Sequence, residues 1–255
     1  FSRQSNMGKL FVLNIFCVLF FNVTSKQIPS YVSLCKINDP NLSMCLKDSI
    51  NALRPYLVKG IPEMDLPPGE PLQFPSVSAD TGGNSAVSVK AKSWNHTVSG
   101  IMDFILNDIS LDLKHSSFSI AVLFPSLRLK GQYTFKGKVL LFEIDTEGTY
   151  ALEATNVTAS GYSHLRSYMK ESKEHVEFEN VQFNVDVKTA KINFTNLIKG
   201  NDEMTEAANT AINQNINIVI DELRGIIGQV FGELLFMYFN SVFRLFPVDE
   251  LLPEN

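Results

Sequence analysis

The chain has 255 residues, of which 45% are hydrophobic and 19% carry a charge, and its formal net charge is −5. This acidic balance argues against nucleic-acid binding, which normally requires a basic face, and against adhesion to anionic membranes. The 3 cysteines and 4 scattered histidines form no recognisable zinc-binding pattern, so neither a metal nor a cofactor is expected.

Residues 1–25 have the features of a leader that contains a secretory signal peptide. Met7 is the expected start, Lys9 supplies a positive charge, residues 10–21 form a short apolar run, and small residues follow it. We therefore expect a secreted, extracellular protein whose mature part, residues 26–255, is a single domain. Loss of the leader changes the formal net charge from −5 to −7.

Secretion gives meaning to the remaining cysteines and to the glycosylation sequons. Cys35 and Cys45 most simply form one disulfide in an oxidising compartment, the alternative being two free thiols. Asparagine followed two residues later by serine or threonine marks a candidate N-glycosylation site. Four such sites occur, at Asn41, Asn95, Asn156 and Asn193. Asn156 is the least favoured, because it shares the alternation of apolar Tyr150 and Leu152.

A short helix is predicted after the leader. Asp39-Pro40 is a suitable helix start, and Gly60 is a suitable end. Between them, apolar residues recur every three or four positions, and Pro55 is expected to kink or shorten the helix. The five prolines of residues 61–75 predict an extended connector, and Gly82-Gly83-Asn84 predicts a turn after it.

Residues 86–195 alternate between apolar and polar side chains, which indicates antiparallel strands with one face buried. The alternation slips by one near Asn180, as a β-bulge would produce. Turns are expected at residues 114–117, 136–138, 147–148 and 160–161. With no alternation of strands and helices, the class is α+β, with one curved sheet of about six strands or more.

The last element is predicted to be one helix from Met204 to Phe246, about 65 Å long at ~1.5 Å per residue. Its apolar stripe widens beyond Gly225 until the helix is apolar nearly all round, so protein or lipid must surround it. We expect an elongated molecule in which the sheet forms a sheath around this helix. A membrane span at residues 226–246 is disfavoured by its scattered polar side chains, Gln229, Glu233, Asn240 and Arg244. Gly225, Gly228 and Gly232 either allow close approach of the sheet or leave room for a ligand.

Several segments resemble the takeout / juvenile-hormone-binding-protein family of secreted insect proteins, over roughly residues 30–253. The matching segments are Cys35, Cys45 with Leu46-Lys47-Asp48, Gly60-Ile61-Pro62-Glu63, Val98–Phe104 (VSGIMDF), Phe124–Tyr133 (FPSLRLKGQY), Phe194–Asn201 (FTNLIKGN), Asn209, Ile212–Asn215 (INQN) and Phe246-Pro247. The resemblance implies a highly curved antiparallel sheet wrapped around one long C-terminal helix, with the short N-terminal helix pinned by the disulfide. It also implies a hydrophobic tunnel for a lipophilic ligand. One cysteine pair instead of two favours the takeout branch over the juvenile-hormone carriers.

Aromatic and aliphatic residues on the predicted inner faces are the candidates for lining the tunnel, although each alone is more typical of an ordinary core. They are Trp94, Phe104, Phe118, Phe124, Tyr133, Phe135, Phe142, Phe178, Phe183, Ile216, Ile220, Leu223 and Phe231. Tyr133 or Trp94 could supply a polar anchor. The expected ligand is terpenoid, juvenile-hormone-like or fatty-acid-like.

Catalytic motifs are scarce. Ser167 and Lys170 match S-x-x-K, a pattern expected by chance, and Ser163-His164 and Glu174-His175 are interpreted as parts of a polar loop between two strands. We therefore expect a non-enzymatic carrier with no catalytic residue. The alternatives are a lipid-transfer-type module that contacts membranes or partner proteins and, less favoured, a lipid-ester hydrolase.

Overall fold

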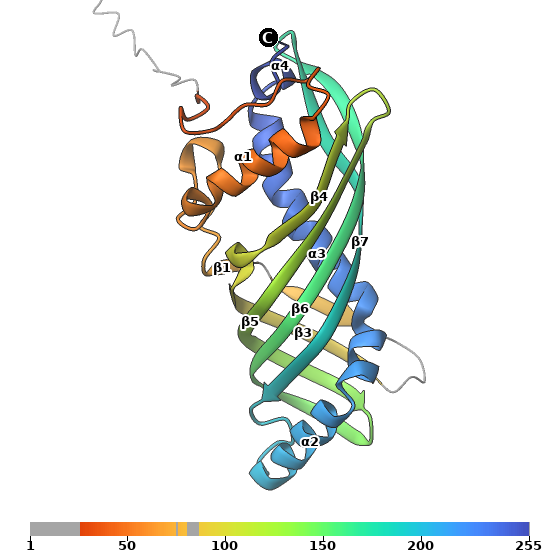
Figure 1. The fold of residues 1–255 in the computed structure, drawn as a ribbon. Coiled ribbons are helices and arrows are strands. Elements are labelled where there is room, and N and C mark those ends of the chain that lie inside the picture. Colours follow the sequence, from red (N-terminus) through yellow and green to blue (C-terminus); the bar gives the residue numbers. More distant parts are fainter. Residues whose placement is uncertain (1–25, 75, 81–86, 255) are drawn as a thin grey trace, which may run out of the picture.

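The computed structural model describes residues 26–74, 76–80 and 87–254. The expected signal peptide (1–25) and the expected turn at 82–84 lie outside these residues. The molecule is elongated, as expected, with a short helix near one end and the sheet running along its length (Figure 1).

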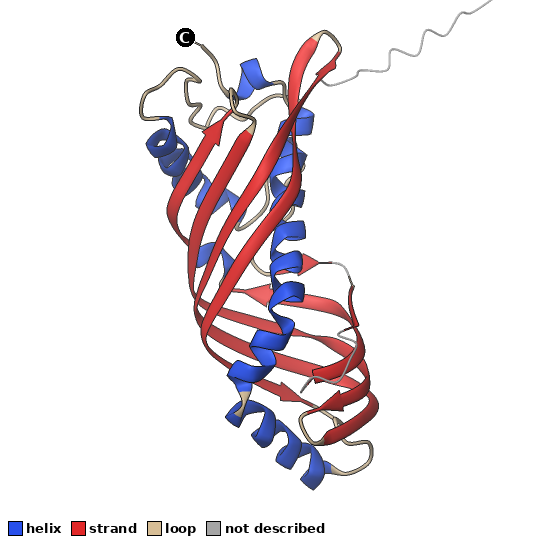
Figure 2. Ribbon diagram, turned by 90° about the vertical axis from the view of Figure 1, so that its right-hand side faces the viewer, coloured by secondary structure: helices blue, strands red, loops and turns tan. Residues whose placement is uncertain are grey.

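One antiparallel sheet of seven strands forms the body of the molecule. Its strands are β1 (Leu72–Phe74), β2 (Val77–Asp80), β3 (Val87–Ser99), β4 (Ile105–Asp112), β5 (Ser117–Val139), β6 (Phe142–Lys170) and β7 (Lys173–Phe194). The order is β1-β3-β5-β6-β7, and β2 also pairs with β3 while β4 pairs with β5. The sheet is strongly curved and does not close (Figure 2). The prediction of a curved antiparallel sheet with a long C-terminal helix is confirmed.

The predicted turn at residues 114–117 is confirmed, but the three turns predicted at 136–138, 147–148 and 160–161 are wrong. Those residues lie inside β5 and β6, which have 23 and 29 residues. Their glycines accommodate neighbours instead: a Cβ on Gly148 would lie 2.3 Å from the Thr195 carbonyl oxygen, and one on Gly161 would lie 2.3 Å from the Phe183 ring. The real hairpins turn at residues 140–141 and 171–172, without glycine.

Two irregularities shape the long strands. The predicted bulge is confirmed, because Asn180 has φ 52° at the point where the pairing of β6 with β7 shifts by one residue. The second irregularity, which we call the crease, lies in the middle of β5 and β6. On each strand the buried residues change there between even-numbered and odd-numbered positions, while the pairing of the two strands stays in register. Phe124 pairs with Val157 and Leu127 pairs with Ala154, and the two residues between them on each strand are exposed. The crease divides the sheet into a half that pairs with β4 and a half that pairs with β3.

The N-terminal helix α1 (Leu42–Leu57) begins two residues later than predicted. Asp39 is not the cap of the helix; its carboxylate accepts a hydrogen bond from the Asn41 N–H at 2.7 Å and shapes the preceding turn. Pro55 lies in the last turn of α1, two residues before the helix ends. Short 3₁₀ turns follow at Pro62–Met64 and Ile101–Asp103.

The predicted single C-terminal helix is divided at Asn215 into α2 (Asp202–Gln214) and α3 (Ile216–Leu245), and α4 (Val248–Leu251) ends the chain. The break is not at a glycine. The Asn215 side chain donates to the Ala211 carbonyl at 2.9 Å, which ends α2 and lets the chain turn onto the sheet.

Helices α2 and α3 close the edge of β7 through asparagine side chains. Asn209 bonds to both the N–H (2.9 Å) and the carbonyl (2.8 Å) of Phe194. Asn213 binds Ile192 in the same way, at 2.8 and 2.7 Å, and Asn240 binds Phe178 at 2.9 and 3.3 Å. Each amide therefore replaces the partner residue that a further strand would supply. We call these three residues the asparagine clamps.

The three glycines of α3 have different roles. A Cβ on Gly228 would lie 2.6 Å from the Phe183 carbonyl oxygen, so this glycine allows close approach to β7. Gly232 lies near Val181 and Phe183 at ordinary contact distances, from 3.6 Å. At Gly225 nothing lies within 4 Å, so this position leaves room. Close approach to the sheet is therefore confirmed at Gly228, while a ligand beside Gly225 stays a prediction.

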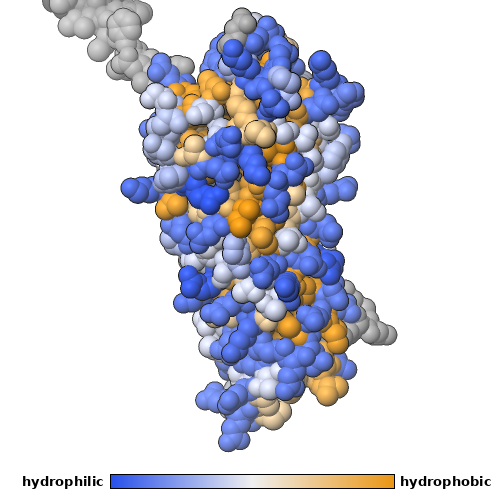
Figure 3. All heavy atoms as spheres, in the orientation of Figure 1, coloured by the Kyte–Doolittle hydropathy of each residue, from blue (hydrophilic) through white to orange (hydrophobic). Residues whose placement is uncertain are grey.

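Among the described helices, α3 is the one that is long and apolar enough to cross a membrane. In the structure it lies along β7, where Asn240 forms its clamp and Arg244 pairs with Glu177. The face seen in Figure 3 is largely hydrophilic, with a discontinuous apolar band running down it.

Candidate functional site

A cavity of about 290 Å³ lies between α1, β4, the first half of β5 and the C-terminal half of α3. It therefore occupies only one side of the crease. On the other side, the interior is filled by a separate cluster around Tyr133, Val139, Ile144, Phe194 and Leu197. The sheet thus encloses a hollow half and a packed half.

Aliphatic and aromatic side chains make up nearly all of the cavity wall. Helix α1 contributes one stripe, at Leu46, Ile50, Leu53 and Leu57. The sheet and α3 contribute the rest, chiefly Leu106, Ile109, Leu111, Phe118, Ile120, Val122, Phe124, Phe231, Leu234, Tyr238, Phe239 and Phe243. Of the residues that the structure describes, none with a formal charge lines this cavity.

The few polar groups of the wall differ in how they are satisfied. The Ser49 hydroxyl donates to the Ser33 carbonyl at 2.6 Å and is thereby occupied. The Tyr238 hydroxyl is buried and has no hydrogen-bond partner among the described residues. Burial raises the pKa of Tyr238 to about 12, so this hydroxyl stays neutral and able to donate.

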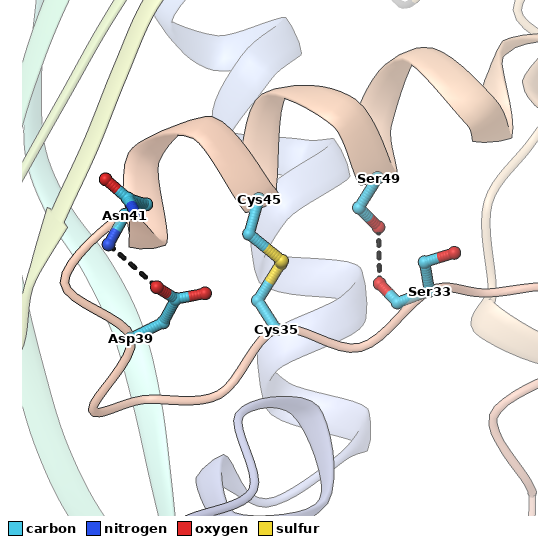
Figure 4. Close-up of a disulfide and its surroundings, with 6 residues drawn as sticks. All are labelled: Ser33, Cys35, Asp39, Asn41, Cys45 and Ser49. Atoms are coloured by element: carbon cyan, nitrogen blue, oxygen red, sulfur yellow. Dashed lines mark hydrogen bonds between the residues drawn. A yellow bond between two sulfur atoms is a disulfide. The ribbon is translucent and has the colours of Figure 1, made fainter.

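The disulfide lies at the rim of the cavity. Cys35 and Cys45 are bonded, with Cα atoms 5.8 Å apart, which confirms the predicted pairing. Figure 4 shows the bond joining α1 to the segment before it, beside the contact between Ser49 and Ser33. Leu34, the residue before Cys35, also lines the cavity and is 44% exposed, so this part of the wall reaches the surface.

Five of the thirteen residues predicted to line a tunnel do line the cavity. They are Phe104, Phe118, Phe124, Phe178 and Phe231. Phe118, Phe178 and Phe239 pack edge-on or stacked with ring centroids 4.9 to 5.2 Å apart, and they form the cavity wall where β5, β7 and α3 meet.

The other eight lie elsewhere. Tyr133, Phe135, Phe142, Ile216 and Leu223 belong to the packed half, and Trp94 and Ile220 do not line the cavity. Phe183 lies on Gly161, outside the cavity. Neither predicted anchor faces the cavity, and the Tyr133 hydroxyl already donates to the Thr195 carbonyl at 2.8 Å.

Sequence reasoning missed the aliphatic part of the wall. The stripe on α1 was visible as a helical period, but nothing in it distinguishes a wall from an ordinary core. Tyr238 falls within the predicted C-terminal helix, and no role was predicted for it. The one indication of its role in the sequence is that its hydroxyl is the only polar side-chain group between Leu234 and Phe239.

The residues of the hydrolase alternative lie in a hairpin, so the predicted polar loop is wrong. Ser163 is on β6 and His175 is on β7. The Ser163 hydroxyl contacts the carbonyls of Glu179 (2.8 Å) and His164 (2.9 Å), next to the bulge. Among the described residues, no histidine ring bonds to Ser163 or Ser167, and His175 approaches the Phe243 carbonyl at 3.3 Å.

All four sequon asparagines have exposed side chains. Asn156 does not follow the inward alternation, because the crease turns it outward with φ 49°. The argument against this site is therefore wrong, and exposure does not separate it from the other three.

Comparison with known proteins agrees with this architecture. The family model described as haemolymph juvenile hormone binding protein matches residues 14–253. The circadian clock-controlled protein daywake of Drosophila yakuba is 21% identical over 234 residues, covering 89% of this chain and 88% of that protein. Daywake of Drosophila melanogaster is 21% identical over 241 residues, covering 91% and 90%.

Among solved structures, Takeout 1 of Epiphyas postvittana superposes with a TM-score of 0.73. It is 22% identical, and the match covers 87% of this chain and 99% of that one. The fold is therefore the takeout fold, and the family model spans nearly the whole sequence. The chain belongs to the haemolymph juvenile hormone binding protein family.

Proposed function

We propose that this protein is a secreted, non-enzymatic carrier that binds one small lipophilic molecule in the cavity beneath α1. The observation that carries the proposal is the apolar, uncharged wall of that cavity. Its volume of about 290 Å³ lies at the lower end of the ~300–1,000 Å³ typical of ligand pockets. Membership of a family of hormone-binding proteins supports the same conclusion.

Desolvation supplies the affinity. Apolar surface removed from water contributes about 25 cal/mol per Å², so ~300 Å² of ligand surface contributes about 7.5 kcal/mol before the entropic costs of binding. This contribution depends on area rather than on direction, so the length and girth of the ligand govern selection.

The wall also selects for neutral ligands. An ionised carboxylate buried without a cationic or hydrogen-bonding partner is strongly disfavoured, and the described wall offers no cation. Terpenoid or fatty esters, alcohols and ketones fit the site, whereas an ionised fatty acid does not.

Two observations support secretion. The disulfide persists in oxidising compartments, and the chain belongs to a family of haemolymph proteins. The exposed asparagines are suitable acceptors for glycans in that route. Neither nucleic-acid binding nor stable membrane insertion forms part of this function.

The test uses a matched pair of ligands, methyl laurate and lauric acid, which displace the fluorescent probe N-phenyl-1-naphthylamine from delipidated protein near neutral pH. The ester should displace the probe at a concentration at least about tenfold lower, or ~1.4 kcal/mol. If neither displaces it, the carrier function is wrong. Equal displacement would retain a carrier but contradict the preference for neutral ligands.

A further inference from the structure

A very small space adjoins the cavity, and a groove that is open to the surface adjoins that small space. The small space, about 10 Å³, lies between β6, β7 and α3. The surface groove, about 420 Å³, lies between β7 and the glycine-containing stretch of α3. Both are separate from the ligand cavity described above.

The three spaces lie in a row, because adjacent ones share lining residues that stand between them. The small space shares Phe118, Phe178 and Phe239 with the cavity. It shares Val181, Phe183 and Phe236 with the groove. A volume of about 10 Å³ corresponds to roughly one water molecule, so the small space is a throat that side chains nearly close.

The local sequence explains where the throat lies. Phe183 pairs with Gly161 across the strands, and its ring covers the site where a Cβ on Gly161 would be. Gly228 and Gly232 allow α3 to approach β7 behind this ring. Phe236, one turn beyond Gly232 on α3, also lines the throat.

The groove beyond the throat has a polar rim and free space. Gln182, Gln229 and Glu233 line it, and the Gln229 amide donates to the Glu233 carboxylate at 2.8 Å. Gly225 leaves the groove open, since no atom lies within 4 Å of its missing Cβ. A path from the rim to the cavity therefore changes from polar to wholly apolar.

We propose that this groove is the second end of the ligand site. A linear lipophilic ligand longer than the cavity passes the throat and places a neutral hydrogen-bonding end group, such as a hydroxyl, at the polar rim. Phe183 and Phe236 then set the longest chain that the protein accepts. This inference rests on the proposed carrier function.

The test measures binding of three isoprenoid alcohols of increasing length, geraniol, farnesol and geranylgeraniol, by displacement of N-phenyl-1-naphthylamine. Each additional buried methylene is worth about fourfold in affinity, or ~0.8 kcal/mol. Phe236→Ala, which widens the throat, should raise the affinity for geranylgeraniol at least about tenfold. It should change the affinity for geraniol by less than about threefold.

Gly225→Trp places a large side chain at the groove, where its Cβ meets no atom within 4 Å. It should weaken the binding of geranylgeraniol at least about tenfold and leave the affinity for geraniol unchanged. Asn217→Trp, at an exposed position on α3 outside the groove, is the matched control. If Phe236→Ala fails to fold, as circular dichroism would report, Gly225→Trp alone decides.

Two different failures are distinguishable. Geraniol that does not bind the unmodified protein would contradict the carrier function itself. The other failure is that geraniol binds but Gly225→Trp and Asn217→Trp show the same affinities for all three alcohols. That result would overturn the second end of the site and leave the carrier function intact.

Discussion

At the scale of single residues, one buried tyrosine and two half-buried tyrosines differ in how their hydroxyl groups are satisfied. Burial raises the pKa of Tyr133, Tyr150 and Tyr238 to about 12, so all three remain neutral at physiological pH. Tyr133 donates to a backbone carbonyl, and the Tyr150 hydroxyl lies 2.9 Å from Nδ1 of His96. Tyr238, in the cavity wall, has no partner among the described residues.

Tyr238→Phe should raise the free energy of unfolding of the empty protein by about 1 kcal/mol, because it removes a buried hydroxyl that lacks a hydrogen bond. Tyr133→Phe, the matched control, should lower it by about 1–2 kcal/mol, since the Thr195 carbonyl loses its donor. Urea unfolding of delipidated protein measures both. A loss of stability in Tyr238→Phe equal to that in Tyr133→Phe would show that Tyr238 has a partner.

His96 makes stability depend on pH. It is buried, its ring stacks on Phe74 with centroids 4.1 Å apart, and burial lowers the pKa of His96 below its ordinary 6.5. The unfolded chain therefore binds more protons than the folded one below about pH 6.5, and stability falls as pH falls from there towards the lowered pKa.

We expect the unmodified protein to lose stability between about pH 7.5 and pH 5, and His96→Gln to lose less of it over the same range. Glutamine keeps a polar group beside Tyr150 and does not titrate. Urea unfolding at several pH values measures the two slopes. Parallel slopes would assign the pH dependence to other groups.

At the scale of elements, α2 and α3 protect the edge of β7. An unpaired edge strand can recruit other chains, and proteins commonly cover or block such edges. The asparagine clamps do so by bonding to both backbone groups of Phe194, Ile192 and Phe178. Between them, Arg224 donates to the Val185 carbonyl at 3.0 Å.

Asn240→Ala should lower the free energy of unfolding by about 2–4 kcal/mol, because it leaves a buried N–H and a buried carbonyl unpaired. Asn217→Ala, at an exposed position of the same helix, should change it by less than about 0.5 kcal/mol. Chemical denaturation compares the two. Equal effects would mean that the Asn240 clamp contributes little to holding α3 on the sheet.

How far the elements could be predicted depends on what each residue type signals alone. The helical stripe and the two-residue alternation show which faces are buried, so the existence of α1, the sheet and the C-terminal helices was predictable. The strand ends were not, because Gly148 and Gly161 serve tight packing against distant residues rather than turns. In the sequence alone, Asn209, Asn213 and Asn240 only interrupt an apolar pattern. Their role becomes clear in the structure, where they bond to the edge of β7.

At the scale of the whole molecule, the crease separates a packed half from a hollow half. The same inward residue types fill both, so the sequence cannot show which half contains the cavity. Phe135 and Phe178 illustrate this: both are inward-facing aromatic residues, but only Phe178 lines the cavity. The parity change between Phe124 and Leu127 was visible in the sequence and marks the division.

The central claim is that this hollow half holds a lipophilic molecule. Val122 projects into the cavity from β5, and tryptophan at that position fills the space. Lys130, exposed on the same strand, provides the matched control, Lys130→Trp.

The most direct measurement is mass spectrometry of an organic extract of the protein secreted from insect cells. We predict one lipophilic compound in stoichiometric amount from the unmodified protein and from Lys130→Trp, and little or none from folded Val122→Trp. Two results would contradict the account. One is an unmodified protein that contains no compound and binds neither terpenoid nor fatty esters, and the other is a compound that Val122→Trp retains in equal amount.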